Sequence, residues 1–341
     1  MIISFYDKDF KGLQNNASLV IEDKSYKLVK RGVDFDTLTC VSEAYTQNIQ
    51  PVFLIVKNDV GNYKYGALAG IPERTKDNKT KINASDLKTM FNSELILEFG
   101  TYTTVNQVLE YIFAQWLLQV NQNSFTVELV IEDTVNLTDL IPPIERKKYN
   151  AWQVIRTYLR FYNLFMTSEI DLINQKVVFT VAKAMQNNLN VKLQDYGILN
   201  YGKWIASINE IQANVLCQGQ CNLGTKWILT SNNQITTNTA LRDIFPVKRK
   251  MLVEEVQTQP EVAGKLAELN KEALIELVGS MYNEDIEIPG LQADFKTKFS
   301  IFLERGAGLY KELPCGELHF DSQGLILVKI GYRFTGLEFI L

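Results

Sequence analysis

The sequence has few of the residue types on which most enzymatic sites depend. Its 341 residues include one histidine, His319, and four cysteines, Cys40, Cys217, Cys221 and Cys315. Four scattered cysteines are too few for a disulfide scaffold in a chain of this size, so reduced thiols are expected. A Ser/His/Asp or Cys/His pair would have to use His319, and the sequence contains no G-x-S-x-G, H-E-x-x-H, P-loop or Rossmann glycine motif. We therefore predict a protein that is not an enzyme and needs no cofactor.

The chain also lacks a charge surplus and a long apolar run. Lys plus Arg number 35 against 39 Asp plus Glu, a formal net charge of −4, whereas neutralising nucleic-acid phosphates requires a basic surplus or a basic face. The longest apolar-rich stretch, Val105–Val120, is interrupted by polar residues and falls short of a membrane-spanning helix. Met1–Phe10 has neither the basic nor the apolar region of a signal peptide. We expect a chain synthesised in a cytoplasm without Sec export.

What the chain does have is 46% apolar residues, enough to fill the cores of two or three compact units. The first hundred residues consist of short runs rich in β-branched and aromatic residues, separated by Asn, Asp and Gly. The predicted strands are Ile2–Tyr6, Ala17–Glu22, Lys27–Lys30, Thr37–Ser42, Pro51–Lys57, Tyr63–Ile71 and Thr80–Asn83. This spacing predicts a small antiparallel barrel or sandwich over residues 1–102. A short helix with Ser85 as its N-cap is expected to follow the last strand.

The hydrophobic period changes after residue 102, which predicts an α+β insertion over residues 103–195. Apolar residues recur at i, i+3 and i+4 from Val105 to Leu117, a helix that begins after Thr103 or Thr104. A second run with the same spacing, from Trp152 to Met166, predicts another amphipathic helix. Strands are predicted at Phe125–Ile131 and Lys176–Ala184.

The last segment, residues 196–341, is predicted to be a second β-rich unit with a helix of its own. The helix spans residues 261–282, beginning after Pro260 and ending by Asn283. The strand-like runs are Trp204–Cys217, Thr225–Ser231, Phe295–Leu303, Glu317–Phe320, Leu325–Tyr332 and Leu337–Leu341, with a mixed stretch at Phe245–Glu255. The whole chain is therefore predicted to be a β-rich α+β protein with two small barrel-like domains around an α+β insertion.

Four sets of residues offer candidate chemistry, and each has a simpler interpretation. Cys217 and Cys221 with Cys315 and His319 can be drawn as a zinc site, but the spacing does not match a zinc ribbon and ordinary buried or turn thiols are favoured. His319 alternates with apolar residues and is interpreted as a solvated strand histidine. The acidic pairs Glu254-Glu255 and Glu284-Asp285 resemble the two carboxylates of a glycosidase, but solvated acids are favoured. The basic clusters Lys248-Arg249-Lys250 and Arg146-Lys147-Lys148 are interpreted as solvated loops or subunit contacts. We assign no catalytic, cofactor-binding or metal-binding residue.

Two stretches of the first β unit resemble bacteriophage and prophage tail proteins. Tyr65–Pro72 is a strand ending in Gly-Ile, and Thr80–Ile96 contains a strand, the helix start Ser85-Asp86-Leu87 and an exit at Ser93-Glu94, where that family often has a basic residue. Similar pieces are Tyr6-Asp7 with Phe10–Gly12, and Ile330–Tyr332 with Gly336–Phe339. The chain resembles the tail hub family that includes the contractile-phage baseplate hub and the N-terminal domain of tail-associated lysins.

This resemblance implies a fold, a location and partners. The family has two barrel-like tube domains per chain, so that three chains form a pseudo-six-fold ring joining the tail tube to the tail tip around the DNA exit channel. Expected partners are two further copies, distal tail or tube proteins, and tip or fibre proteins, with DNA passing without specific binding. The long helix, Val262–Met281, would pack against a tube domain or a neighbouring chain. The lytic extension of the lysin branch is not expected here. Two alternatives stay open: a tail-associated peptidase or glycosidase, and a host-receptor-binding tail protein.

Overall fold

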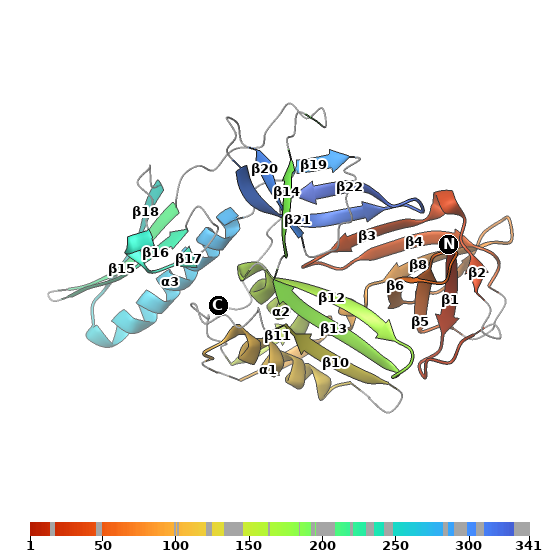
Figure 1. Cartoon of the computed structure of the whole chain (residues 1–341). Coiled ribbons are helices and arrows are strands. Elements are labelled where there is room, and N and C mark those ends of the chain that lie inside the picture. The colour runs from red at the N-terminus through yellow and green to blue at the C-terminus, as the bar shows by residue number, and fades with distance from the viewer. Residues whose placement is uncertain are drawn as a thin grey trace.

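The computed structural model describes most of the chain. The described residues are 1–13, 18–45, 50–98, 100, 102–120, 125–132, 146–162, 164–183, 185–191, 195, 209–218, 221–229, 235–241, 248–281, 286–289, 299–304 and 310–330. They form a large sheet, a helical unit packed below it and a smaller sheet covered by one long helix (Figure 1). This arrangement confirms the predicted β-rich α+β class.

The N-terminal part of the large sheet is built from short strands whose side chains alternate between two faces. Its strands are β1 (Ile2–Tyr6), β2 (Leu19–Val20), β3 (Lys27–Arg31), β4 (Thr37–Ser42), β5 (Phe53–Lys57), β6 (Tyr63–Leu68), β7 (Glu73–Arg74) and β8 (Thr80–Ser85). In β8 every second residue is buried, as expected for a sheet with one solvated face. Strand β5 is buried on both faces, because Leu54 and Val56 lie in one hydrophobic core and Phe53 and Ile55 in the other.

C-terminal strands extend this same sheet. They are β14 (Met185–Val191), β19 (Ile286–Pro289), β20 (Phe299–Glu304), β21 (Tyr310–Phe320) and β22 (Leu325–Ile330). Glu317–Phe320 of β21 pairs antiparallel with Leu28–Arg31 of β3, so β21 and β3 lie side by side (Figure 1). The sheet has 13 strands, and its main path runs from β14 to β2 without closing among the described residues. Barrel closure is therefore not confirmed, and the boundaries at 102 and 195 stay predictions.

The helical unit lies below the large sheet in Figure 1. It contains α1 (Val105–Leu117), α2 (Ala151–Phe161), the sheet β10 (Thr126–Ile131), β13 (Lys176–Lys183) and β12 (Leu164–Asp171), and the pair β9 (Glu94–Leu97) with β11 (Lys147–Asn150). The Thr104 hydroxyl accepts from Gln107 N, and the Asn150 side chain accepts from Gln153 N, so both helices begin at side-chain caps. The start predicted for the first helix is confirmed.

Two predicted element boundaries in this region are wrong. The second helix ends at Phe161, and Met166 lies in β12 opposite Val181 of β13. Cross-strand pairing with β13 decides the conformation of Leu164–Asp171, and the helical spacing of Met166 is coincidental. The short helix is a 3-10 helix, η3 (Leu87–Phe91), and its N-cap is Asp86. Ser85 is the last residue of β8, where it pairs with Thr37.

The smaller sheet and its helix stand apart on the left of Figure 1. The strands are β15 (Asn209–Cys217), β16 (Cys221–Leu229), β17 (Ile235–Thr236) and β18 (Lys248–Val256), and the helix is α3 (Gln259–Met281). The predicted helix over residues 261–282 is thus confirmed within two residues. Its apolar stripe, including Val262, Leu269 and Leu277, is buried against β15, β16 and β18 of the same chain.

The remaining short elements are the 3-10 helices η2 (Asp23–Ser25) and η6 (Thr239–Leu241). Of the predicted strands, residues 204–208 and 337–341 lie outside the described residues, as do Glu284 and Asp285. Within the described ranges, every helix is too short or too polar to cross a lipid bilayer.

Candidate functional site: a buried ionic junction

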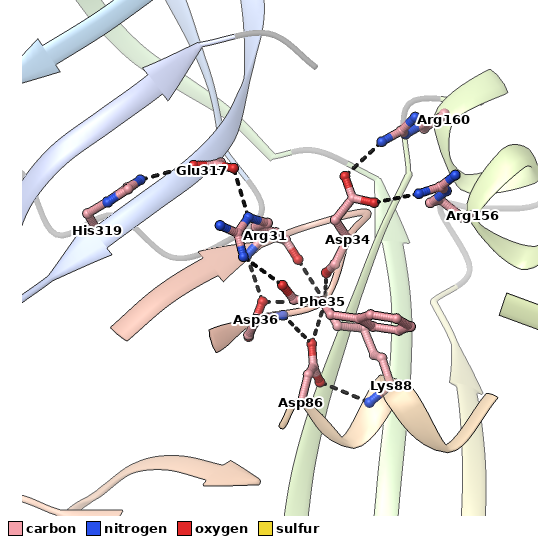
Figure 2. Close-up of polar contacts among 10 residues, drawn as sticks. All are labelled: Arg31, Asp34, Phe35, Asp36, Asp86, Lys88, Arg156, Arg160, Glu317 and His319. Carbon is pink, nitrogen blue, oxygen red and sulfur yellow. Dashed lines mark hydrogen bonds and ion pairs between the residues drawn. The ribbon is translucent and has the colours of Figure 1, made fainter. Parts of the chain in front are cut away.

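Charged side chains meet where the large sheet contacts the helical unit. The ionic junction consists of Arg31, Asp34, Phe35, Asp36, Asp86, Lys88, Arg156, Arg160, Glu317 and His319 (Figure 2). Its centre is the turn between β3 and β4, residues 31–36, which carries four of the ten. Gly32 is required in this turn, because a Cβ at this position would lie 1.6 Å from the Phe165 ring of β12. The turn therefore packs closely against the helical unit.

Lys88 is the most deeply buried cation of the junction. It lies in the first turn of η3 with 1% of its side chain exposed. Its Nζ atom is 3.0 Å from Asp86 Oδ2 and 3.5 Å from Asp36 Oδ1, and it donates at 2.7 Å to the carbonyl oxygens of Arg31 and Asp34. Burial lowers the pKa of Lys88, but the two carboxylates outweigh burial and the net pKa is raised. The ammonium therefore stays charged and holds the turn to η3.

The two carboxylates that face Lys88 are themselves hydrogen-bonded to backbone and side-chain donors. Asp86 is fully buried and accepts from Asp36 N at 2.8 Å, Lys88 N at 2.9 Å and Ser168 Oγ at 3.2 Å. Asp36 accepts from Arg31 N at 2.6 Å. Burial raises the pKa of Asp36 to about 6, although the charge of Lys88 opposes this shift. Asp36 therefore keeps its proton to a higher pH than an ordinary aspartate does.

Asp34 connects the turn to α2. Arg156 and Arg160 are four residues apart and so lie on one face of the helix. Arg156 Nη1 donates to Asp34 Oδ1 at 3.0 Å, and Arg160 Nη2 donates to Asp34 Oδ2 at 2.7 Å. Phe35 adds an aromatic contact, stacking on Trp152 of α2 with ring centroids 5.0 Å apart. Two ion pairs and one ring stack therefore hold the turn between β3 and β4 against α2.

Arg31 connects the turn to the C-terminal strands. Its Nε donates to Glu317 Oε1 at 2.8 Å, and its Nη1 donates to Phe35 O at 2.9 Å. His319 Nε2 lies 3.0 Å from the other carboxylate oxygen of Glu317. Burial acts to raise the pKa of Glu317, but the hydrogen bonds with Arg31 and His319 outweigh it and hold the pKa below its ordinary value. The junction therefore links the N-terminal strands, the helical unit and β21.

The chemistry of the junction is that of a structural link. Its carboxylates bind cations and backbone donors at hydrogen-bonding distance (Figure 2). A cavity of about 50 Å³ adjoins it, lined in part by Lys30, Arg31, Asp36 and Tyr65. This volume holds a few water molecules and is far below the roughly 300–1,000 Å³ of ligand pockets. Within the described ranges, no three His, Cys, Asp or Glu residues converge as metal ligands would.

The structure separates the residues of the zinc alternative. Cys217 pairs with Cys221 in the backbone register of the β15–β16 hairpin of the smaller sheet, whereas Cys315 and His319 belong to β21 of the large sheet. His319 lies in a strand, as predicted, with 25% of its side chain exposed, and its Nε2 atom is 3.0 Å from Glu317 Oε2. Glu317 is two residues away and lies on the same face of β21.

The charged pairs of the sequence lie at strand ends and edges. Glu254 and Glu255 are exposed on β18, and the cluster that starts at Lys248 begins the same strand. In the other basic cluster, Arg146 and Lys148 pair with acids on and beside β9, at 3.0 Å from Glu98 and 2.7 Å from Glu94. Sequence reasoning did not identify the junction. Asp86 and Lys88 do fall in the stretch that carries the family resemblance, which was the only available signal.

The comparisons with known proteins define the class of fold. No known family profile matches this sequence, and no curated protein matches it either. The fold is similar to that of a known prophage tail protein. The structure of prophage tail protein gp18 from Listeria monocytogenes EGD-e aligns over 98% of this chain and 96% of its own length, with a TM-score of 0.53 and 9% sequence identity. The predicted resemblance to phage tail proteins is therefore confirmed at the level of the fold.

Two further structures align with TM-scores below 0.5, too low to carry a fold argument. A PdpA–VgrG complex aligns over 97% of this chain and 64% of its own, with a TM-score of 0.47 and 13% identity. The E. coli c3393 protein, a type VI secretion component described as similar to T4 bacteriophage tail proteins gp27 and gp5, aligns over 95% of this chain and 78% of its own. Its TM-score is 0.46 and its identity 8%.

The raised pKa of Asp36 predicts how stability depends on pH. The folded protein binds this proton more tightly than the unfolded chain, so the stability that the group contributes is present at about pH 4 and is lost as the pH rises to about 6. Asparagine mimics the protonated carboxyl. Asp36→Asn is therefore expected to gain stability relative to the wild type between about pH 4 and about pH 8 in urea unfolding. Asp77→Asn, at an exposed position, is the control, and an unchanged or opposite trend at Asp36 would contradict the assignment.

Proposed function

We propose that this chain is a structural tail protein of hub type, which joins the tail tube of a bacteriophage or prophage to its tail tip. In the proposed particle, three copies form a ring around the channel through which DNA leaves. The observation that carries the proposal is the extent of the likeness to gp18. It covers 98% of one chain and 96% of the other, so it involves the whole architecture and not one common sheet.

The ionic junction fits such a role mechanically. A subunit of a tail tip must keep its parts in a constant geometry while the tube and the tip exert force on it. Arg31 and Glu317 are 286 residues apart in the sequence, yet they bond at 2.8 Å, and Asp34 bonds two arginines 122 and 126 residues away. These ion pairs are buried or half-buried, which makes them less sensitive to salt than surface pairs.

The net charge fits a channel that DNA crosses without specific binding, because a formal charge of −4 gives phosphates no general attraction. The two tube domains are proposed as residues 1–102 and 196–341, with residues 103–195 as the insertion between them. Their partners would be distal tail or tube proteins on one side and tip or fibre proteins on the other. The protein would be synthesised in the bacterial cytoplasm and would be located in the virion. No residue is assigned a catalytic role.

The test is to locate the chain in tails isolated from the strain that encodes it. An epitope tag at the exposed loop residue Asn78, detected with gold-labelled antibody, is expected to mark the junction between tube and tip in electron micrographs. A three-fold reconstruction of that region should contain three copies. Gold along fibres would instead support receptor binding, and loss of turbidity of cell-wall suspensions with purified chain would support a hydrolase. Either outcome would overturn the hub assignment. Deleting the chain should leave particles without an organised tip.

A further inference from the structure

Strand β18 forms an edge of the smaller sheet. The strand order is β17-β16-β15-β18, and among the described residues the second edge of β18 has no strand partner. The strand is nine residues long, contains no proline and exposes 62% of Met251 and 47% of Val253. A long edge with free backbone N–H and C=O groups and exposed apolar side chains is a template for pairing with another strand.

The charges along β18 are arranged with opposite signs at its two ends. The strand reads Lys248-Arg249-Lys250, then Met251-Leu252-Val253, then Glu254-Glu255-Val256. Consider an antiparallel copy of this strand with Leu252 opposite Leu252. That register places Arg249 opposite Glu255, Lys250 opposite Glu254 and Met251 opposite Val253. Side chains directly opposite in an antiparallel pair lie about 5 Å apart at Cβ, so each of these contacts is favourable.

The same register keeps the faces of the two sheets consistent. Lys250 bonds Glu276 of α3 and Leu252 is buried, so even-numbered residues face the helix. Arg249, Met251, Val253 and Glu255 alternate with them and face the opposite side. In the proposed register each residue lies opposite a residue whose side chain is on the same face of the sheet. The two smaller sheets would therefore form one continuous sheet with both α3 helices on the same side.

Other pairings of two β18 strands are less favourable. A parallel, in-register pairing places each charge opposite a like charge, which is destabilising. Moving the antiparallel register by two residues in one direction places Lys248 opposite Glu254 and leaves no other ionic contact. Moving it by two residues in the other direction places Met251 opposite Glu255 and leaves no ionic contact. The charge order of Lys248–Val256 therefore specifies both the direction and the register of its partner.

We propose that β18 is a self-pairing surface through which two copies of this chain form a two-fold symmetric dimer. The partner is a second copy because an antiparallel copy of β18 supplies the reversed charge order. A two-fold contact is self-complementary and cannot join neighbours within a cyclic three-fold ring. The β18 dimer is therefore a contact outside the proposed ring, and its test does not depend on the proposed function.

The register is tested by disulfide trapping in the full-length chain. In the variant Leu252→Cys the introduced thiol would lie opposite its own copy across the two-fold axis. In Met251→Cys the introduced thiol would lie opposite Val253 of the other copy. The Cα atoms of the two introduced cysteines would then be more than roughly 7 Å apart, which is too far for a disulfide. Collisional oxidation would favour the more exposed position 251, at 62% against 9% for position 252. We expect Leu252→Cys to form disulfide-linked dimer faster than Met251→Cys does. The wild-type chain serves as the blank. Equal or faster linkage by Met251→Cys would overturn the proposal.

The charge order is tested by sedimentation of variants at low salt. Glu254→Lys with Glu255→Lys places lysines opposite Lys250 and Arg249, and is expected to raise the dimer dissociation constant by about 100-fold. Glu73→Lys with Asp77→Lys makes the same change in net charge at exposed positions near β7 and should leave dimerisation unchanged. Circular dichroism checks that each variant is folded. A wild-type chain that stays monomeric throughout, or equal weakening by both double variants, would overturn the proposal.

Discussion

Replacing Lys88 with methionine is expected to lower the free energy of unfolding by about 3–5 kcal/mol, which is the usual cost of removing one partner from a buried ion pair. Methionine fills a similar volume, so the loss reports the charge and not a cavity. Asp86 is fully buried and Asp36 9% exposed, and both would lose their cation. Two backbone carbonyls, those of Arg31 and Asp34, would lose a donor at the same time.

Urea unfolding followed by circular dichroism measures this change. Lys27→Met is the matched control, because Lys27 is an exposed lysine of β3 and its loss should change stability by less than about 0.5 kcal/mol. Combining Lys88→Met with Asp86→Asn is expected to cost less than the sum of the two single changes, since the second removes a carboxylate left without its cation. A loss below about 1 kcal/mol for Lys88→Met would show that Lys88 does not hold the junction together.

The second large effect is expected in the smaller sheet. Leu277 of α3 is fully buried against the sheet, and Leu277→Ala should lower the free energy of unfolding by about 2–5 kcal/mol through lost burial and the cavity left behind. Hydrogen exchange should show faster exchange in β15 and α3 than in the wild type, because these elements form a sheet and helix of their own.

The control for this prediction lies on the opposite face of the same helix. Glu272 is exposed, and Glu272→Ala should leave exchange and unfolding nearly unchanged. If Leu277→Ala were equally neutral, α3 would not be packed on β15, β16 and β18 as described. If instead it accelerated exchange to the same degree in β3 and β4, the smaller sheet would not open separately from the large one.

The contrast between α1, α3 and β12 shows which elements are predictable from sequence. Helices α1 and α3 have a 3.6-residue apolar period together with start signals, Thr104 before one and Pro260 at the beginning of the other, so both were predicted nearly to their ends. The run that ends at Met166 has compatible spacing but no stop signal, and only the pairing of β12 with β13 ends the helix at Phe161. Local spacing cannot report a partner strand that follows later in the chain.

The ionic junction was not predictable for a related reason. Lys88 follows a capping aspartate in a polar stretch, which is typical of a solvated helix start. Its burial depends on a turn more than fifty residues earlier, which supplies Asp36 and two carbonyl groups. Arg31 and Glu317 likewise look like solvated strand residues until β3 and β21 become neighbours. Charge type and position in a sequence do not specify which charges will share a low-dielectric interior.

The sequence by itself determined the β-rich α+β class, the positions of α1 and α3, and the scarcity of catalytic residues, with His319 as the single histidine. These properties depend on composition and on local periodicity, which are written in consecutive residues. Only the tertiary structure decided that β21 extends the N-terminal sheet, that Lys88 is buried between two carboxylates, and that Arg31 bonds Glu317. Each of these depends on contacts between distant segments, whose free energy arises only when the whole chain is folded.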